Sequence, residues 1–425
     1  MNYAIVKFII GKVLYFEAAF MMLPCVTAII YQEESGWAFF FTALLCVLIG
    51  AVLTRKSPKN SVFYVKEGFV TVALSWIVMS LMGGIPFLIG GVMTNPVDAL
   101  FETVSGFTTT GASILTDVEI VPKCMLMWRS FTHWIGGMGV LVFLLSFMHT
   151  HGSGSHMNLM KAESPGPSVS KLVPHVKDTA KILYGIYIAI TICEATILRA
   201  LGMPLFDSLT TTFGTVGTGG FGIRNDSIAG YSPAIQITIT VFMILSGINY
   251  TAYFYILTGK IKELFKIEEV RWYLAIIFGS VAVITWNVRS LYPTFSETLR
   301  HAFFQVGSII TTTGYATTDF DLWPALSKTL LVTLMFIGAC AGSTSGGIKV
   351  SRILILLKTI RKELSLIIHP RQVKKIRMDG HPVDHETLRS ANVFLVVYFV
   401  LLLTSMLLIS CLLYTSPSPR DGLLS

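Results

Sequence analysis

Long apolar stretches separated by short polar connectors run through the whole chain. A helix needs about 20 apolar residues to cross a bilayer. On that basis the pattern predicts nine spans, at residues 4–31, 36–54, 68–92, 125–149, 179–203, 233–258, 271–291, 322–368 and 388–414. The eighth stretch is too long for one helix, and the small-residue run GACAGSTSGG at 338–347 interrupts it. We therefore expect a broken helix there.

Composition agrees with this pattern and narrows the class of protein. Of the 425 residues, 53% are hydrophobic and only 13% are charged, whereas an average soluble domain is about 25% charged. The six cysteines form no CxxC pair, so we expect them to be small packing residues rather than metal or redox groups. These features exclude a soluble enzyme, a disordered chain and a disulfide-stapled secreted domain. They predict an all-α polytopic membrane protein.

Basic residues gather in every second connector, which predicts the orientation of the chain. By the positive-inside rule these connectors are cytoplasmic, and so is the N-terminus. Because the basic residues lie in short connectors rather than on one solvated face, no nucleic-acid partner is expected. They follow spans two, four and six and the break in span eight, at Arg55, Lys56, Lys59; Lys161, Lys171, Lys177; Lys260, Lys262, Lys266, Arg271; and Arg352, Lys358, Arg361, Lys362, Arg371, Lys374, Lys375, Arg377.

The opposite connectors contain an internal repeat. ALFETVSGFTTTG (Ala99–Gly111) and AFFQVGSIITTTG (Ala302–Gly314) share a frame without gaps and the same ending. DSLTTTFGTVGTG (Asp207–Gly219) fits that frame more loosely. The repeat predicts pseudo-repeats of helix, pore helix, filter loop and helix around a central cation pore.

A short helix that ends at mid-membrane points its negative C-terminal dipole into a cavity. The Thr-Gly segment after it can offer backbone carbonyls in place of a cation's hydration shell. An anion pore would instead need Lys or Arg in these segments, and they contain none. The alternative, a polar turn between helices, is disfavoured because the motif recurs in equivalent places.

At these motifs the chain resembles the membrane subunit of the Trk/Ktr/HKT superfamily of potassium transporters, most closely the TrkH type with an extra N-terminal helix pair. The likeness extends to about residue 410 and is carried by FETVSGFTTTGAS (101–113), HWIGGMGV (133–140), TVGTGGFG (215–222), TTTGYAT (311–317) and GACAGSTSGGIKVSR (338–352).

The resemblance implies gated potassium uptake across a bacterial inner membrane. It implies a homodimer in the lipid bilayer that binds a cytosolic nucleotide-binding regulatory subunit of the TrkA kind. It implies neither a catalytic residue nor a covalently bound cofactor, and K⁺ is the transported ion. It maps the filter to Thr109, Thr110, Gly111, Gly217, Thr218, Gly219, Thr312, Thr313 and Gly314. Of these, Thr110, Gly111, Thr218, Gly219, Thr313 and Gly314 would contact K⁺, and the gate would consist of Gly338, Gly342, Ser343, Gly346, Gly347 and Lys349.

The repeats divide the chain into predicted domains. A fourfold filter needs four loops, and a fourth filter glycine would fall near position 430 by the repeat spacing. We therefore expect residues 411–425 to be a non-native tail, and the chain as written not to conduct selectively. The segments are 1–60 (N-terminal helix pair), 61–177, 178–265 and 266–380 (three pore repeats, the last with the broken helix), 381–410 (first helix of an incomplete fourth repeat) and 411–425 (the tail).

Several ionisable residues fall within apolar segments, where each is a functional hypothesis. We expect Arg129 to pair with the pore-helix acid Glu102, Glu194 to pair locally with Arg199, and Glu17 to pair with a lysine of a neighbouring helix. Two rival functions remain. A secondary active transporter would show inverted repeats, and a membrane-embedded enzyme would need a positioned nucleophile, metal or acid–base pair.

Overall fold

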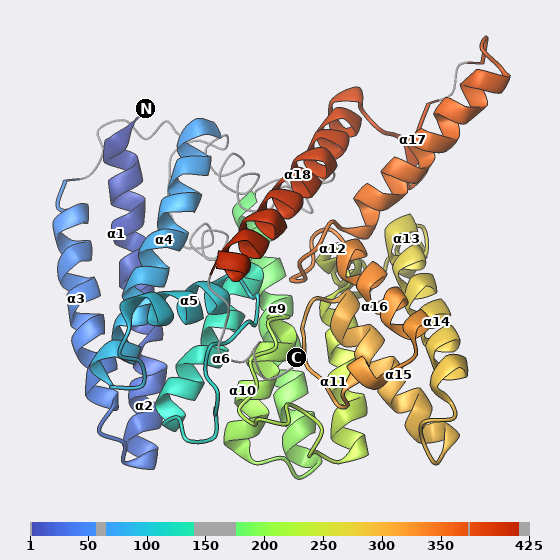
Figure 1. Cartoon of the computed structure of the whole chain (residues 1–425). Helices are drawn as coiled ribbons and strands as arrows, with labels where there is room; N and C mark the ends of the chain where they lie inside the picture. Colours follow the sequence, from blue (N-terminus) through green and yellow to red (C-terminus); the bar gives the residue numbers. More distant parts are fainter. Residues whose placement is uncertain (1, 57–64, 140–175, 373–374, 416–425) are drawn as a thin grey trace. The chain divides into compact units, whose positions relative to one another are not determined.

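The structure is a computed structural model that describes residues 2–56, 65–139, 176–372 and 375–415. It divides into two compact units, Met1–Val350 and Ser351–Ser425. The first unit holds the N-terminal helix pair, the first two predicted pore repeats and the third predicted repeat as far as Val350 (Figure 1).

The N-terminal helix pair consists of a long hairpin. α1 (Tyr3–Phe20) and α2 (Met22–Tyr31) follow one another with a break at Met21, and α3 (Gly36–Thr54) returns beside α1. Gly11 and Gly50 face each other at the crossing, where a Cβ on Gly50 would lie 3.0 Å from the Gly11 carbonyl oxygen. Small residues let the two backbones approach closely, as is common between membrane helices.

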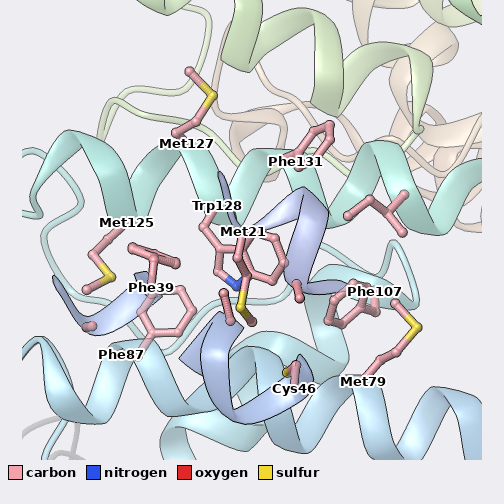
Figure 2. Packing of buried hydrophobic residues seen from close by; sticks show 14 of the residues in the cluster. Met21, Phe39, Cys46, Met79, Phe87, Phe107, Met125, Met127, Trp128 and Phe131 are labelled. Atoms are coloured by element: carbon pink, nitrogen blue, oxygen red, sulfur yellow. The ribbon is translucent and has the colours of Figure 1, made fainter. Parts of the chain in front are cut away.

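The first pore repeat contains α4 (Val65–Ile89), α5 (Pro96–Phe107) and α6 (Lys123–Met138). The Asn95 side chain accepts a hydrogen bond from the Val97 amide and caps α5, with Pro96 at the first helical position, as both residue types favour. Trp128 of α6 packs edge-on against Phe39 and Phe107, with ring centroids 6.0 Å apart in each case. Figure 2 shows this core, which joins the repeat to the N-terminal helix pair.

The second repeat contains α9 (Val176–Ala200), α10 (Leu205–Val216) and α11 (Pro233–Ser246), followed by α12 (Tyr250–Leu257) and the short α13 (Ile261–Leu264). The predicted span at 233–258 is not one continuous helix, because α11 and α12 are bent by 94°. The Asn249 side chain accepts from the Thr251 amide and so starts a new helix.

The third repeat contains α14 (Glu268–Val288), α15 (Phe295–Ile310), the 3₁₀ turn η1 (Phe320–Leu322) and α16 (Ala325–Ile337). A non-helical loop, residues 338–349, follows α16. The break predicted within the eighth stretch is therefore confirmed.

The second unit contains nearly all of α17 (Val350–Ile368), a hairpin of β1 (Arg377–Met378) and β2 (His381–Pro382), and α18 (His385–Thr415). The strands are antiparallel, with Arg377 opposite Pro382. The Arg352 guanidinium lies 4.0 Å from the centroid of the Phe394 ring and joins α17 to α18. Helix α18 continues through residues 411–415, and the rest of the predicted tail lies outside the described residues.

Several helices are long and apolar enough to cross a membrane. The described residues contain six of them, at Tyr3–Tyr31, Gly36–Thr54, Lys66–Ile89, Ala180–Ala200, Glu268–Val288 and His385–Cys411, and a seventh if the bent α11–α12 pair is one span. The predicted fourth span, 125–149, starts within α6, which has 16 residues, and its part from residue 140 is outside the described residues. The fold is that of an all-α polytopic membrane protein.

Candidate ion-conduction site

Each predicted filter segment follows a short helix, and the three helix ends have the same backbone geometry. After α5, the Thr109 amide donates to the Gly106 carbonyl at 3.1 Å and the Thr110 amide to the Ser105 carbonyl at 2.9 Å. Thr218 and Gly219 repeat this pattern after α10 at 3.0 and 2.9 Å, and Thr312 and Thr313 repeat it after α15 at the same two distances. The repeat seen in the sequence is therefore also a repeat of backbone conformation.

This geometry corrects the register of the second segment. Thr109, Thr218 and Thr312 share left-handed φ values of 55°, 53° and 56°, and the residue two places later is again left-handed. That residue is Gly111 (φ 74°), Gly220 (φ 81°) and Gly314 (φ 88°). The counterpart of Gly111 and Gly314 is thus Gly220, not Gly219, and the frame runs over Ser208–Gly220. The sequence carries a signal for this register, since it places a threonine second in all three tetrads, TTTG, GTGG and TTTG.

The three filter segments are neighbours in chain order. A methyl group on Gly111 would collide with the Gly219 carbonyl oxygen, and one on Gly220 would collide with that of Thr313. One on Gly314 would meet nothing within 4 Å. Thr110 and Gly314 are exposed, whereas Thr218 is buried between the other two segments. The described segments therefore form an arc with one side open between the third and the first.

The electrostatics of the arc favour a cation. The tetrads contain only threonine and glycine, so the polar groups they offer are carbonyls, hydroxyls and amides. All three short helices end at the arc, and each directs the negative end of its dipole there.

A buried ion pair supports the arc from behind, as the sequence predicted. Arg129 Nε lies 2.5 Å from a carboxylate oxygen of Glu102, with both side chains almost fully buried. Glu102 also accepts from the Ser113 hydroxyl at 3.0 Å and the Ile114 amide at 3.2 Å. Arg129 Nη1 donates to the Gly222 carbonyl at 3.0 Å. The pair thereby joins the residues after the first filter segment to those after the second.

Two further residues behind the arc escaped sequence reasoning. The His133 ring stacks on Phe221 with centroids 4.1 Å apart, and a methyl group on Gly219 would collide with that ring. The Tyr315 hydroxyl lies 3.2 Å from the Thr211 carbonyl oxygen and 3.3 Å from that of Phe221. The motifs HWIGGMGV and TTTGYAT include His133 and Tyr315, but nothing in either motif identifies its partner.

The predicted gate residues lie together in the loop at 338–349. The Lys349 amide donates to the Ile337 carbonyl at 3.0 Å and closes the neck of the loop, where Gly338 packs against Gly347. The Lys349 ammonium donates a hydrogen bond to the Ser345 carbonyl, and the Ser343 hydroxyl donates one to the Cys340 carbonyl. The Gly346 amide donates to the Thr312 hydroxyl at 2.7 Å. The loop therefore touches the third filter segment directly.

Two of the expected ion pairs do not form among the residues that the structure describes. Arg199 donates to the Met203 carbonyl and not to Glu194. Glu17 and Glu194 are fully buried, and their carboxylate oxygens have no hydrogen-bond partner among the described residues. Both helices turn these side chains inward, so Glu194 and Arg199 do not meet although they are close in sequence.

The loops that follow the filter segments of the first two repeats are also joined. The Asn225 side-chain amide donates to Asp117 at 2.8 Å, and its carbonyl oxygen accepts from the Val118 amide at 3.0 Å. The hydrogen bond from the Asn225 side chain holds the pKa of the Asp117 carboxyl below its ordinary value.

Comparison with known proteins identifies the family. The TrkH family, described as cation transport proteins, matches residues 35–416. The chain belongs to the TrkH family. It is 34% identical over 416 residues to the Trk system potassium uptake protein TrkH of Salmonella typhimurium, and the match covers 96% of the chain and 86% of the relative. The TrkH of Escherichia coli K12 matches equally well over the same shares.

A solved TrkH structure has the same fold. The crystal structure of the potassium transporter TrkH from Vibrio parahaemolyticus superposes with a TM-score of 0.86 at 30% identity, over 96% of this chain and 85% of that one. Membership of the TrkH family makes the chain a multi-pass membrane protein of a transport family.

Proposed function

We propose that the chain is the membrane subunit of a potassium uptake system and that K⁺ passes through the arc of filter segments. The observation that carries the proposal is the threefold recurrence of one backbone conformation, with left-handed residues at equivalent places in TTTG, GTGG and TTTG. Glycine or threonine at these places turns successive carbonyls toward one path, as a carbonyl-lined filter requires. The TrkH relatives named as potassium uptake proteins support the choice of ion.

Backbone carbonyls take the place of water around the ion in this proposal. They come from Thr110 and Gly111, from Thr218 and Gly219, and from Thr313 and Gly314, with Thr109, Gly217 and Thr312 directly before these pairs. The corrected register adds Gly220 to this set. In this proposal the loop at 338–349 lies below the filter and acts as the gate, because its Gly346 amide already donates a hydrogen bond to the Thr312 hydroxyl of the third filter segment. The gate residues in this loop are Gly338, Gly342, Ser343, Gly346, Gly347 and Lys349.

A fourth filter segment belongs on the open side of the arc. The exposure of Thr110 and Gly314 supports this. Where the first segment meets the second, and the second meets the third, the residues cover each other, whereas no described segment covers Thr110 and Gly314 at the two ends of the arc. In this proposal α18 is the first helix of a fourth repeat, after the repeats at 61–177, 178–265 and 266–380.

The remaining assignments are part of the same proposal. The protein lies in a bacterial inner membrane with its N-terminus in the cytoplasm, since the basic connectors then obey the positive-inside rule. It acts as a homodimer with a cytosolic nucleotide-binding regulatory subunit of the TrkA kind. A secondary active transporter for an organic substrate is not favoured, because inverted repeats would not give the three filter segments one shared conformation and one chain order.

Rubidium uptake in a host without its own potassium uptake systems tests the function. We expect the chain extended by a fourth pore repeat to restore growth at low potassium and to take up rubidium saturably. The 425-residue chain alone should not discriminate K⁺ from Na⁺, because one wall of its filter is open.

Complete Vibrio parahaemolyticus TrkH serves as the positive control for this assay. If the extended chain is present in the membrane and transports no rubidium while the control does, the proposed function is wrong. Selective uptake by the 425-residue chain alone would instead contradict the need for a fourth segment.

A further inference from the structure

Glu269 is a buried carboxylate that the filter and the predicted gate residues leave unexplained. It lies in the first turn of α14 and is only 4% exposed. Its Oε1 accepts a hydrogen bond from the backbone amide of Ala341 at 2.7 Å. Ala341 is at the buried side of the loop at 338–349, between Cys340 and Gly342. A carboxylate on a helix of the third repeat therefore holds the backbone of that loop.

The same part of the loop is bound to the break between α11 and α12. The Cys340 amide donates to the Gly247 carbonyl at 3.0 Å, and the Tyr250 amide donates to the Gly342 carbonyl at 3.0 Å. The Thr344 hydroxyl adds a bond to the Ser246 carbonyl at 3.2 Å. Three consecutive loop residues are thus each hydrogen-bonded to a different partner. Cys340 is bonded to Gly247, Ala341 to Glu269, and Gly342 to Tyr250.

These contacts use the groups that a broken helix leaves without partners. The break after Ser246 frees the carbonyl of Gly247 from the α-helical pattern, and the start of α12 leaves the Tyr250 amide without a helical acceptor. Buried groups of this kind need partners, and the loop provides them. Conversely, the buried Ala341 amide has Glu269 as its acceptor.

We propose that Glu269 is a positioning residue that latches the loop at 338–349 against the α11–α12 break, so that the gate consists of both broken helices. The inference rests on the proposed function only in treating this loop as the gate. Releasing the latch frees the Ala341 amide from α14, so that Cys340 and Gly342 beside it can move, while the neck at Gly338 and Lys349 stays closed. Motion of α12 reaches the loop through the Tyr250 amide, and α12 leads into the basic connector that begins at Lys260.

The Cys340 thiol reports on the latch directly, because Cys340 is a free cysteine with no exposed surface and adjoins Ala341. The half-buried or exposed cysteines Cys25, Cys193 and Cys411 are first replaced by serine, and Cys46 and Cys124 remain as buried internal references. The 425-residue protein in nanodiscs is treated with a charged methanethiosulfonate reagent, and mass spectrometry follows each thiol.

Glu269→Ala should accelerate the modification of Cys340 by about tenfold, the usual effect of losing one hydrogen bond to a charged group. Cys46 and Cys124 should react at the unchanged rate. Glu269→Gln should stay within about threefold of the parent, because its amide oxygen can still accept from Ala341. Glu263→Ala, which removes an exposed carboxylate of α13, is the matched control and should have no effect.

An unchanged Cys340 rate in Glu269→Ala would overturn the latch. Glu269→Ala could unfold the protein and so expose Cys340, Cys46 and Cys124 together. In that case Glu269→Asp tests the latch, because aspartate keeps the charge but its shorter side chain moves the carboxylate oxygen away from the Ala341 amide. Selective acceleration at Cys340 in Glu269→Asp supports the latch, and equal rates or a general acceleration overturn it. Because labelling needs no ion flux, a failure of the latch and a failure of the proposed function are separately visible.

Discussion

Gly220→Ala should abolish the preference for K⁺ over Na⁺ and lower rubidium flux by about 100-fold in the chain extended by a fourth repeat. Alanine at this position would hold a left-handed φ of 81°, which costs about 1–2 kcal/mol. Its methyl group would also collide with the Thr313 carbonyl oxygen, and such overpacking costs about 1–3 kcal/mol. About 3 kcal/mol in total corresponds to a factor of about 100. Rubidium flux and K⁺/Na⁺ permeability ratios in proteoliposomes measure the effect.

Gly91→Ala separates the effect of backbone strain from the effect of the filter. Gly91 also has a left-handed φ, 73°, but lies in the turn after α4 with nothing within 4 Å of an added methyl group. This variant should lose only the backbone-strain part of the free energy, about 1–2 kcal/mol, and keep its selectivity. An unaltered permeability ratio in Gly220→Ala would contradict the register that pairs Gly220 with Gly111 and Gly314.

Arg129→Met should destabilise the protein by about 3–5 kcal/mol, because it leaves Glu102 charged, buried and without its cation. The side chains of the pair are 3% and 0% exposed, so water cannot replace the lost partner. The Gly222 carbonyl loses a donor as well. Thermal unfolding in detergent, followed by size-exclusion chromatography, should show a clearly lower midpoint than that of the parent chain.

Two further variants make this prediction specific to burial. Combining Arg129→Met with Glu102→Gln removes both charges and should recover much of the loss. Lys266→Ala breaks an exposed pair with Glu263, whose side chains are 67% and 47% exposed, and should cost less than about 1 kcal/mol. A double variant as unstable as Arg129→Met alone would show that packing, rather than the unpaired carboxylate, dominates.

The sequence predicted those features that depend on local pattern. Apolar runs of sufficient length gave the helices, and GACAGSTSGG predicted the break that the structure has at 338–349. The recurrence of Thr-Thr-Thr-Gly located the first and third filter segments, since identical local sequence imposes identical helix ends. The pairing of Arg129 with Glu102 was also predictable, because a charge in an apolar segment needs a partner.

Other features could not be predicted because they depend on contacts between distant segments. The second break, after Ser246, contains Gly247 and Asn249, which also occur within continuous helices. The backbone groups that have no helical partner at this break form hydrogen bonds with the loop at 338–349, about 90 residues later in the chain. The break and the loop therefore stabilise each other. The expected Glu194–Arg199 pair failed for a similar reason, since packing sets which side of a helix faces inward.

By itself the sequence determined the membrane class of the chain, its recurring Thr-Gly motifs and the polar groups that these motifs offer, because hydropathy and repeated motifs act within one segment. Only the tertiary structure decided that Gly220 is the counterpart of Gly111, that Glu269 holds Ala341, and that the arc is open between Gly314 and Thr110. The physical reason is that the conformation of a non-helical backbone is set by whichever distant groups satisfy its amides and carbonyls.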